Sequence, residues 1–210
     1  MRPFQFITHC NNRYDYIEGA RLALEGGCRW IQLRMKNTPD CKIEEAAARL
    51  KPLCAEYGAV FILNDRVDLA LKVKADGVHL GKNDTDPAEA RKQAGASFII
   101  GGTANTFADV KTLVEKGVNY IGLGPYRFTA TKERLSPILG IDGYGDIMKQ
   151  CKKSGINIPI VAIGGIEKEN IPALMKTGIP GIAVSSAILS ANDPARETKE
   201  IMKILNNNHG

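Results

Sequence analysis

The stretch IPIVAIGGI at residues 158–166 is followed, after a helical pattern at residues 170–176, by a second apolar run, GIAVSS at residues 181–186. Both runs are rich in β-branched residues and almost continuously hydrophobic, which is typical of parallel strands that are covered on both faces. A helical pattern between two such strands indicates a strand–helix–strand unit. The two runs therefore predict a parallel sheet with helices packed against it.

The same unit repeats along the rest of the chain. Eight short apolar runs are found, at residues 4–8, 30–33, 60–63, 77–80, 98–101, 120–123, 158–163 and 181–185. Helical patterns lie between or after them, at residues 14–25, 43–57, 87–94, 108–116, 142–152, 170–176 and 194–205. This alternation predicts a single-domain α/β fold over residues 1–210, in which the sheet closes into a (β/α)8 TIM barrel. A doubly wound open sheet is the alternative.

Local signals mark the ends of several predicted helices. Asp86-Pro87-Ala88-Glu89 supplies an N-cap residue, a proline at the first helical position and a glutamate three residues after the cap. Glycines follow four of the helical patterns as stop signals, at Gly95, Gly117, Gly155 and Gly178. These signals favour helices of ordinary length between the strands.

Composition limits the classes of function. The chain has 210 residues and a formal net charge of +5, but its basic residues are dispersed among acidic ones. Only six Phe and six Tyr are available for stacking on bases. We therefore expect no nucleic-acid partner. A basic site for small anionic substrates explains the excess of positive charge at least as well.

The cysteines and the apolar runs indicate in which cellular compartment the protein is expected. The five cysteines are scattered and never form a C-x-x-C pair, which argues against a disulfide framework and against a zinc site. No apolar stretch approaches the roughly 18 residues that a membrane span needs, and no basic leader precedes the first strand. We expect a cytoplasmic protein that has no membrane contact, and the sequence leaves a homo-oligomer open.

Polar residues gather where the second predicted strand ends. Active-site groups of barrels lie at the carboxyl ends of strands and in the loops that follow. Alternation along Gln32-Leu33-Arg34-Met35-Lys36 sends Gln32, Arg34 and Lys36 to one side. Two cations and an amide on one side indicate either an anion site or a set of solvated basic residues.

Two carboxylates follow the third and fourth predicted strands. Asp65 and Asp84 emerge from adjacent strand ends, and paired carboxylates beside Lys and Arg suit a Mg²⁺ ion shared with a diphosphate. Helix capping is the alternative interpretation. Asp65 could cap the next helix with Asp68 at N3, whereas Asp84 is harder to explain in this way because Asp86 already occupies the capping position.

The fifth and sixth strands add hydroxyls and a lysine. Thr103 ends the fifth strand and could donate to a phosphate or cap the following helix. Residues 124–137 form a long loop after the sixth strand, and long loops in compact barrels are usually functional. The polar residues of this loop favour anion binding over plain linkage, and they are Thr129, Thr131 and Lys132.

The most specific signal from the residues alone lies at the ends of the seventh and eighth strands. Gly164 and Gly165 would let backbone amides approach a phosphate, and Ser185 and Ser186 stand at the start of a following helix. A phosphate site after strands seven and eight of a barrel requires this combination. No Ser-His-Asp set is evident, and we interpret His79 as a residue of the barrel interior.

These motifs together resemble the thiamine phosphate synthase family over essentially the whole chain. The stretches that carry the resemblance, by their order and spacing, are Gln32 to Lys36, Asn64 to Leu71, Ala75 to Gly81, Gly122 to Lys132, and Ile160 to Ile166. The resemblance implies a transferase that joins hydroxymethylpyrimidine diphosphate to hydroxyethylthiazole phosphate with loss of diphosphate. It also implies Mg²⁺ as cofactor and a dissociative mechanism through a pyrimidine carbocation.

The resemblance assigns roles to individual residues, with Asp65 and Asp84 as the metal ligands. The residues that would bind the pyrimidine diphosphate are Gln32, Arg34, Lys36, Asn64, Thr103 and Lys132. Arg34, Lys36 and Lys132 would be catalytic, because they neutralise charge that builds on the leaving diphosphate. The residues that would bind the thiazole phosphate are Thr129, Thr131, Gly164, Gly165, Ser185 and Ser186.

Three positions depart from the family pattern, and two other functions compete. Met35, Lys82 and His9 stand where a glutamate, a glutamine and an acid are common, and none of them is an expected ligand of phosphate or metal. We therefore expect altered tuning with retained activity. A thiazole tautomerase-like paralogue would not be expected to keep both carboxylates together with the segment 129–132. A non-catalytic thiamine phosphate-binding protein would bind its ligand without turnover.

Overall fold

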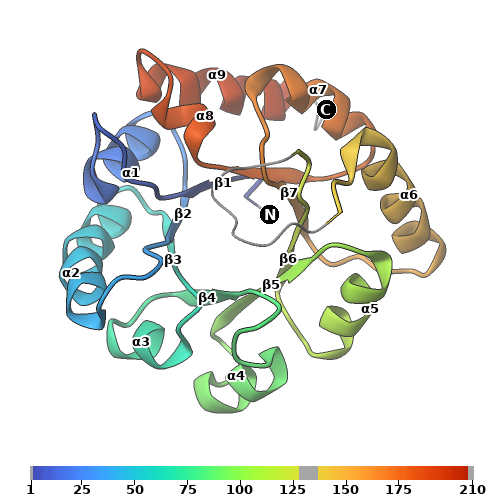
Figure 1. Ribbon diagram of the computed structural model, residues 1–210, viewed down its shortest axis with the longest axis horizontal. Helices are drawn as coiled ribbons and strands as arrows, with labels where there is room; N and C mark the ends of the chain where they lie inside the picture. The colour runs from blue at the N-terminus through green and yellow to red at the C-terminus, as the bar shows by residue number, and fades with distance from the viewer. Residues whose placement is uncertain (1, 128–136, 208–210) are drawn as a thin grey trace.

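The structure is a computed structural model, which describes residues 2–127 and 137–207. Eight parallel strands form a closed barrel in the order β1 to β8, with β8 paired to β1 (Figure 1). The strands are β1 (Phe4–Ile7), β2 (Trp30–Leu33), β3 (Val60–Asn64), β4 (Gly77–Leu80), β5 (Ile99–Ala104), β6 (Tyr120–Leu123), β7 (Ile160–Ile163) and β8 (Gly181–Val184).

Helices surround the barrel as an outer ring (Figure 1). The helices are α1 (Tyr16–Glu25), α2 (Asp40–Glu56), α3 (Val67–Lys72), α4 (Pro87–Ala94), α5 (Phe107–Glu115), α6 (Gly140–Lys153), the 3₁₀ turn η1 (Lys168–Asn170), α7 (Ile171–Lys176), α8 (Ser186–Leu189) and α9 (Pro194–Asn207). The single-domain (β/α)8 TIM barrel is thereby confirmed. The open-sheet alternative is wrong, because Phe4 of β1 is in register with Ile182 of β8.

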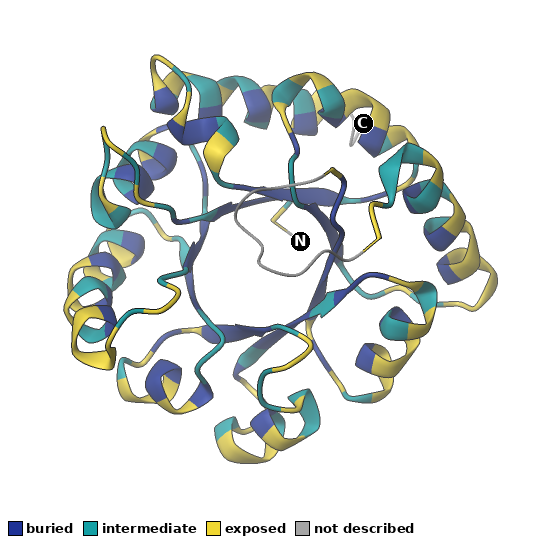
Figure 2. Cartoon of the chain, viewed as in Figure 1, coloured by how far each residue is buried: buried dark blue, intermediate teal, exposed yellow. Residues whose placement is uncertain are grey.

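Alternation along the strands separates two cores. Side chains such as Phe4 and Phe6 point outward and are fully covered by the helices, where burial of each aromatic ring contributes roughly 1.5–3 kcal/mol. The second core lies inside the barrel and consists of Trp30, Ile62, Tyr120, Val161, Ile163 and Ala183. Figure 2 shows the resulting pattern, with buried strands at the centre and exposed residues on the outer faces of the helices.

Most element boundaries follow from local sequence chemistry. Helix α4 spans the predicted range because the Asp86 side chain accepts a hydrogen bond from the Ala88 amide at 2.9 Å and Pro87 occupies the first turn. Gly95 ends the same helix at φ +79°, a conformation that favours glycine. Helices α3 and α8 were expected after the third and eighth strands but were given no range, since six and four residues are too few for a clear helical period.

All five cysteines are free thiols, with Cys28, Cys54 and Cys151 buried and Cys10 and Cys41 exposed. Within residues 2–127 and 137–207, none of the helices combines the length and apolar character that crossing a bilayer requires.

Candidate active site

Asp65 is held at the end of β3 by its backbone, and its side chain faces a lysine. Its φ of 69° is left-handed, and its amide donates a hydrogen bond to the carbonyl of His79 in β4 at 2.8 Å. The neighbouring residue Arg66 is the N-cap of α3, and its side chain makes no capping hydrogen bond. The capping interpretation of Asp65 is therefore wrong. The carboxylate lies 3.0 Å from the ammonium of Lys36, an ion pair that joins the ends of β2 and β3.

Asp84 lies in the loop after β4 and faces Asp65. Its Oδ2 accepts a hydrogen bond from the Gly81 amide at 2.6 Å, which folds the side chain back over the strand end. Burial raises the pKa of Asp84, and the adjacent Asp65 carboxyl raises it further. The Gly81 amide and the Lys36 ammonium act in the opposite direction. Two carboxyls that repel each other at one strand-end edge form a natural position for a cation.

The donor set fits Mg²⁺ better than a transition metal. In the described part of the chain, no group of three or more His, Cys, Asp and Glu side chains converges as a metal cage. Mg²⁺ commonly takes only one or two carboxylates from the protein and completes its octahedron with water and substrate phosphates. Asp65 and Asp84, with Lys36 beside them, offer that arrangement.

A polar hydrogen-bonded chain crosses the barrel interior beneath this edge. The Gln32 amide donates to Oε1 of Gln5 at 3.2 Å, and the Gln5 amide donates to the Tyr120 hydroxyl at 3.4 Å. Nδ1 of His79 lies 3.0 Å from that hydroxyl, and Nε2 of His79 lies 3.0 Å from the Thr103 hydroxyl. His79 is buried, as predicted for a residue of the barrel interior. This hydrogen-bonded chain connects two of the predicted substrate ligands, Gln32 and Thr103.

Gln5 and Tyr120 are polar interior residues that the sequence analysis did not identify. Gln5 interrupts the apolar strand Phe4–Ile7, and its side chain is 1% exposed. A buried amide requires hydrogen-bond partners, so a glutamine at an inward position of a strand is the signal that would have found it. Tyr120 begins β6 and gives no comparable signal, because tyrosine is common in strands.

The remaining residues of the β2–β4 side have defined environments. The Arg34 amide donates to the Thr8 hydroxyl at 3.0 Å, which ties the chain after β2 to the end of β1. Asn64 is half-buried at the end of β3, where it is in register with His79. The Met35 side chain packs against the hydrophobic core. These contacts leave the ends of β2 and β3 firmly connected to their neighbours.

The two remaining departures from the family pattern are Lys82 and His9. The Lys82 ammonium lies 2.6 Å from Asp109, whose carboxylate also accepts hydrogen bonds at the start of α5. Lys82 therefore connects the loop after β4 to α5. His9 is half-buried in the segment that follows β1.

Backbone groups dominate the opposite side of the barrel mouth. Gly164 and Gly165 follow β7 with φ values of 88° and 70°. The Gly164 carbonyl accepts a hydrogen bond from the Arg127 amide at 3.0 Å, and a Cβ at Gly164 would lie 2.8 Å from Cβ of Pro125. Ser185 is the N-cap residue of α8 and Ser186 is its first residue. This side combines glycines and hydroxyls and has no carboxylate among the predicted site residues.

Three predicted ligands lie outside the described residues. Thr129, Thr131 and Lys132 belong to residues 128–136. The described ends of that segment are Arg127, which is exposed, and Pro137. The roles of the three residues therefore stay predictions.

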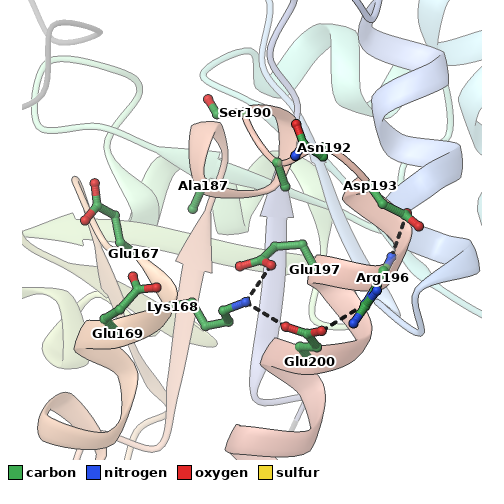
Figure 3. A pocket seen from close by; sticks show the side chains of 11 residues that line it. Glu167, Lys168, Glu169, Ala187, Ser190, Asn192, Asp193, Arg196, Glu197 and Glu200 are labelled. Atoms are coloured by element: carbon green, nitrogen blue, oxygen red, sulfur yellow. Dashed lines mark hydrogen bonds and ion pairs between the residues drawn. The ribbon is translucent and has the colours of Figure 1, made fainter.

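A surface pocket lies beside the β7–β8 side, and its charge distinguishes it from a phosphate site. The pocket has a volume of about 530 Å³, and Figure 3 shows Lys168 pointing to Glu197 and Glu200, at 2.7 Å each. Its acidic and basic lining residues are Glu167, Glu169, Asp193, Glu197, Glu200, Lys168 and Arg196. Carboxylates outnumber cations among these residues, a composition that does not suit a phosphate ligand. Its ion pairs connect η1 to α9.

The closed barrel and the polar groups at its strand ends define a (β/α)8-barrel enzyme. Comparison with known proteins identifies the family: the family model described as thiamine monophosphate synthase matches residues 4–188. A thiamine-phosphate synthase of Phocaeicola vulgatus is 58% identical over 200 residues, covering 95% of this chain and 96% of the relative. The chain belongs to the thiamine monophosphate synthase family, and it is a transferase.

Solved structures agree with this assignment. Thiamine phosphate pyrophosphorylase from Pyrococcus furiosus superimposes with a TM-score of 0.88 at 36% identity, covering 100% of this chain and 98% of that one. A 3-hexulose-6-phosphate synthase matches with a TM-score of 0.70 at 20% identity, covering 97% of this chain and 99% of that one. The second likeness shows the barrel fold alone.

Proposed function

We propose that this chain joins hydroxymethylpyrimidine diphosphate to hydroxyethylthiazole phosphate and releases thiamine phosphate and diphosphate. The observation that carries the proposal is the cluster of Asp65, Asp84 and Lys36 at adjacent strand ends. Paired carboxylates beside a cation are suited to holding a metal ion together with a phosphate group. A reaction that expels diphosphate benefits from such a site, because the leaving group carries several negative charges.

Asp65 and Asp84 are the groups that would hold Mg²⁺ in this scheme. When bound, Mg²⁺ supplies positive charge to the diphosphate and so weakens the bond to the pyrimidine methylene. The Asp84 carboxylate is already oriented by the Gly81 amide, and Asp65 by its left-handed backbone. Such pre-orientation lowers the cost of assembling the site around the substrate.

The chemistry would then proceed by ionisation followed by addition. The carbon–oxygen bond of the pyrimidine diphosphate breaks, its electron pair leaves with the diphosphate, and the resulting carbocation is stabilised by the aminopyrimidine ring. The thiazole nitrogen donates its electron pair to the carbocation and forms the new carbon–nitrogen bond. No strong base is required. The catalytic contribution of Arg34, Lys36 and Lys132 is to neutralise charge on the departing diphosphate.

The other predicted ligands would fix the two substrates in place. Gln32, Asn64 and Thr103 would bind the pyrimidine diphosphate from the interior ends of β2, β3 and β5. The residues assigned to the thiazole phosphate are Gly164, Gly165, Ser185, Ser186, Thr129 and Thr131. Amides next to glycines and hydroxyls at a strand end are suited to a phosphate monoester. The two substrates would thus approach each other across the barrel mouth.

The direct test is a two-substrate assay. Purified protein is incubated with hydroxymethylpyrimidine diphosphate and hydroxyethylthiazole phosphate, in Mg²⁺ or in EDTA, and thiamine phosphate and diphosphate are both quantified. Equal amounts of the two products in Mg²⁺, and none in EDTA, are expected. If folded protein forms neither product, the synthase proposal fails. An assay of thiazole tautomerisation would then test the paralogue, and tight thiamine phosphate binding without turnover would indicate the non-catalytic alternative.

A further inference from the structure

In the polar hydrogen-bonded chain inside the barrel, the groups present determine which atom donates and which accepts in each hydrogen bond. The Tyr120 oxygen accepts a hydrogen bond from the Gln5 amide, and Tyr120 has a single proton to donate. Among the hydrogen bonds of residues 2–127 and 137–207, the acceptor within reach of that proton is Nδ1 of His79, 3.0 Å away. A ring nitrogen that accepts a hydrogen bond carries no proton, so a neutral His79 carries its proton on Nε2.

The direction continues to the edge of the site. Nε2 of His79 lies 3.0 Å from the Thr103 hydroxyl, so the imidazole donates and the hydroxyl oxygen accepts. The Thr103 proton is then left to point away from His79. Thr103 is half-buried near the end of β5, one residue before the strand finishes. A hydroxyl held in this way is a donor toward the barrel mouth.

The packing around the chain is built to hold it in place. A Cβ at Gly101 would lie 2.6 Å from Nδ1 of His79 and 2.2 Å from Cζ of Tyr120, so only glycine leaves room for their contact. The Trp30 ring packs edge-on against Tyr120, with 4.7 Å between ring centroids. Burial raises the pKa of Tyr120, whereas the amides of Gln5 and Gln32 lower it, as donors to its oxygen do. The phenol therefore stays protonated as the donor to His79.

We propose that His79 and Tyr120 are positioning residues that hold the Thr103 hydroxyl as a hydrogen-bond donor to an acceptor atom of the pyrimidine diphosphate. The inference rests on the proposed function for the identity of the ligand. The internal part of the inference, the protonation of His79 on Nε2, does not depend on any substrate. His79 acts through Thr103 and takes no proton from the substrate.

The tautomer can be read without substrates. Protein labelled with ¹⁵N-histidine is recorded by NMR, and the His79 resonances are assigned by their loss in His79→Gln. The expected result is an unprotonated Nδ1 and a proton-bearing Nε2 in the unmodified protein, and a mixture of tautomers in Tyr120→Phe. A proton on Nδ1 in the unmodified protein would reverse the direction of the chain and overturn the proposal, whether or not the protein makes thiamine phosphate.

Kinetics test whether the direction matters for the substrate. Thr103→Val and Tyr120→Phe are each expected to lower kcat/KM for the pyrimidine diphosphate by roughly 3- to 10-fold, the loss of one neutral hydrogen bond. The double variant should be no slower than the slower single variant, because both changes remove the same donor. Thr103→Ser should restore most of the activity. Losses that multiply in the double variant would overturn the proposal.

A matched control separates positioning from general damage. Thr198 is a fully buried threonine in α9, whose hydroxyl donates to the Pro194 carbonyl at 2.9 Å, remote from the strand ends. Thr198→Val makes the same change of side chain as Thr103→Val, and it is expected to lower thermal stability while leaving kcat/KM within about twofold. An equal loss of kcat/KM in both valine variants would count against a specific role for Thr103.

Discussion

The two sides of the barrel mouth are built on different principles. On the β2–β4 side, the side chains of Lys36, Asp65 and Asp84 face one another, and their charges determine what they can bind. On the β7–β8 side, the predicted ligands are the backbone around Gly164 and the hydroxyls at the start of α8. Side-chain charge can be removed without moving the backbone, whereas a glycine cannot be replaced without strain. The two sides should therefore respond differently to substitution.

The largest expected effect is on the charged side. Asp84→Ala removes one of the two proposed Mg²⁺ ligands and should lower kcat by about 10²- to 10³-fold, the loss expected when a main source of charge stabilisation disappears. The fold should be retained, because the Asp84 side chain lies in a loop and caps no helix. Mg²⁺-dependent turnover and circular dichroism measure the two quantities. Near-normal Mg²⁺-dependent activity would remove Asp84 from the site.

A smaller effect is expected from the lysine beside the carboxylates. Lys36→Met removes one cation from the leaving diphosphate and should slow single-turnover ionisation by roughly 10- to 100-fold, the value of one charge-assisted hydrogen bond. Lys82→Met is the control, because Lys82 is engaged with Asp109 at 2.6 Å. The control should stay within about twofold of the unmodified rate. Equal losses in both variants would mean that general positive charge, and not the position of Lys36, promotes ionisation.

The backbone side should show a binding defect together with a loss of stability. Gly164→Ala adds a Cβ at 2.8 Å from Cβ of Pro125 and forces alanine into φ 88°. We expect KM for the thiazole phosphate to rise by about 10-fold and stability to fall by roughly 2–5 kcal/mol. Substrate titrations and chemical denaturation measure the two changes.

The matched control for this variant is a second glycine with a positive φ. Gly178 has φ 90°, and a Cβ there would meet no atom within 4 Å. Gly178→Ala should lose only about 1–2 kcal/mol and leave KM unchanged. A raised KM for the pyrimidine diphosphate in Gly164→Ala, with no change for the thiazole phosphate, would contradict the assignment of the two sides.

The smallest expected effect concerns pH and the metal-free protein. The folded-state pKa of Asp84 is raised by burial and by Asp65. The folded protein therefore binds the Asp84 proton more tightly than the unfolded chain does. The stability that this proton contributes is fully present below the unfolded pKa of 3.8 and is lost as the pH rises through the folded pKa. Asp84→Asn should therefore melt slightly higher than the unmodified protein at pH 7 in EDTA, and the gain should vanish at low pH. A lower melting temperature at pH 7 would show that the carboxylate is stabilising.

Much of the candidate site could be predicted because barrel topology places every strand end on one face. Asp65 and Asp84 follow consecutive strands, so parallel order alone brings them to the same edge. The choice between capping and metal binding could not be made for Asp65, because it depends on where α3 begins. The helix begins at Val67 with Arg66 as N-cap, and Asp65 adopts a left-handed backbone that turns its side chain toward Lys36.

The sequence by itself determined the alternation of strands and helices, the polar residues at the strand ends and the absence of a disulfide framework, because each is written in short-range patterns. Tertiary structure decided between the predicted closed barrel and the open sheet by pairing β8 with β1, and it alone showed the hydrogen bond between Gln5 and Tyr120, residues 115 positions apart. Neither feature has a local signal. Closure depends on the accumulated twist and stagger of eight strands, and the buried polar chain exists only once opposite walls of the barrel face each other.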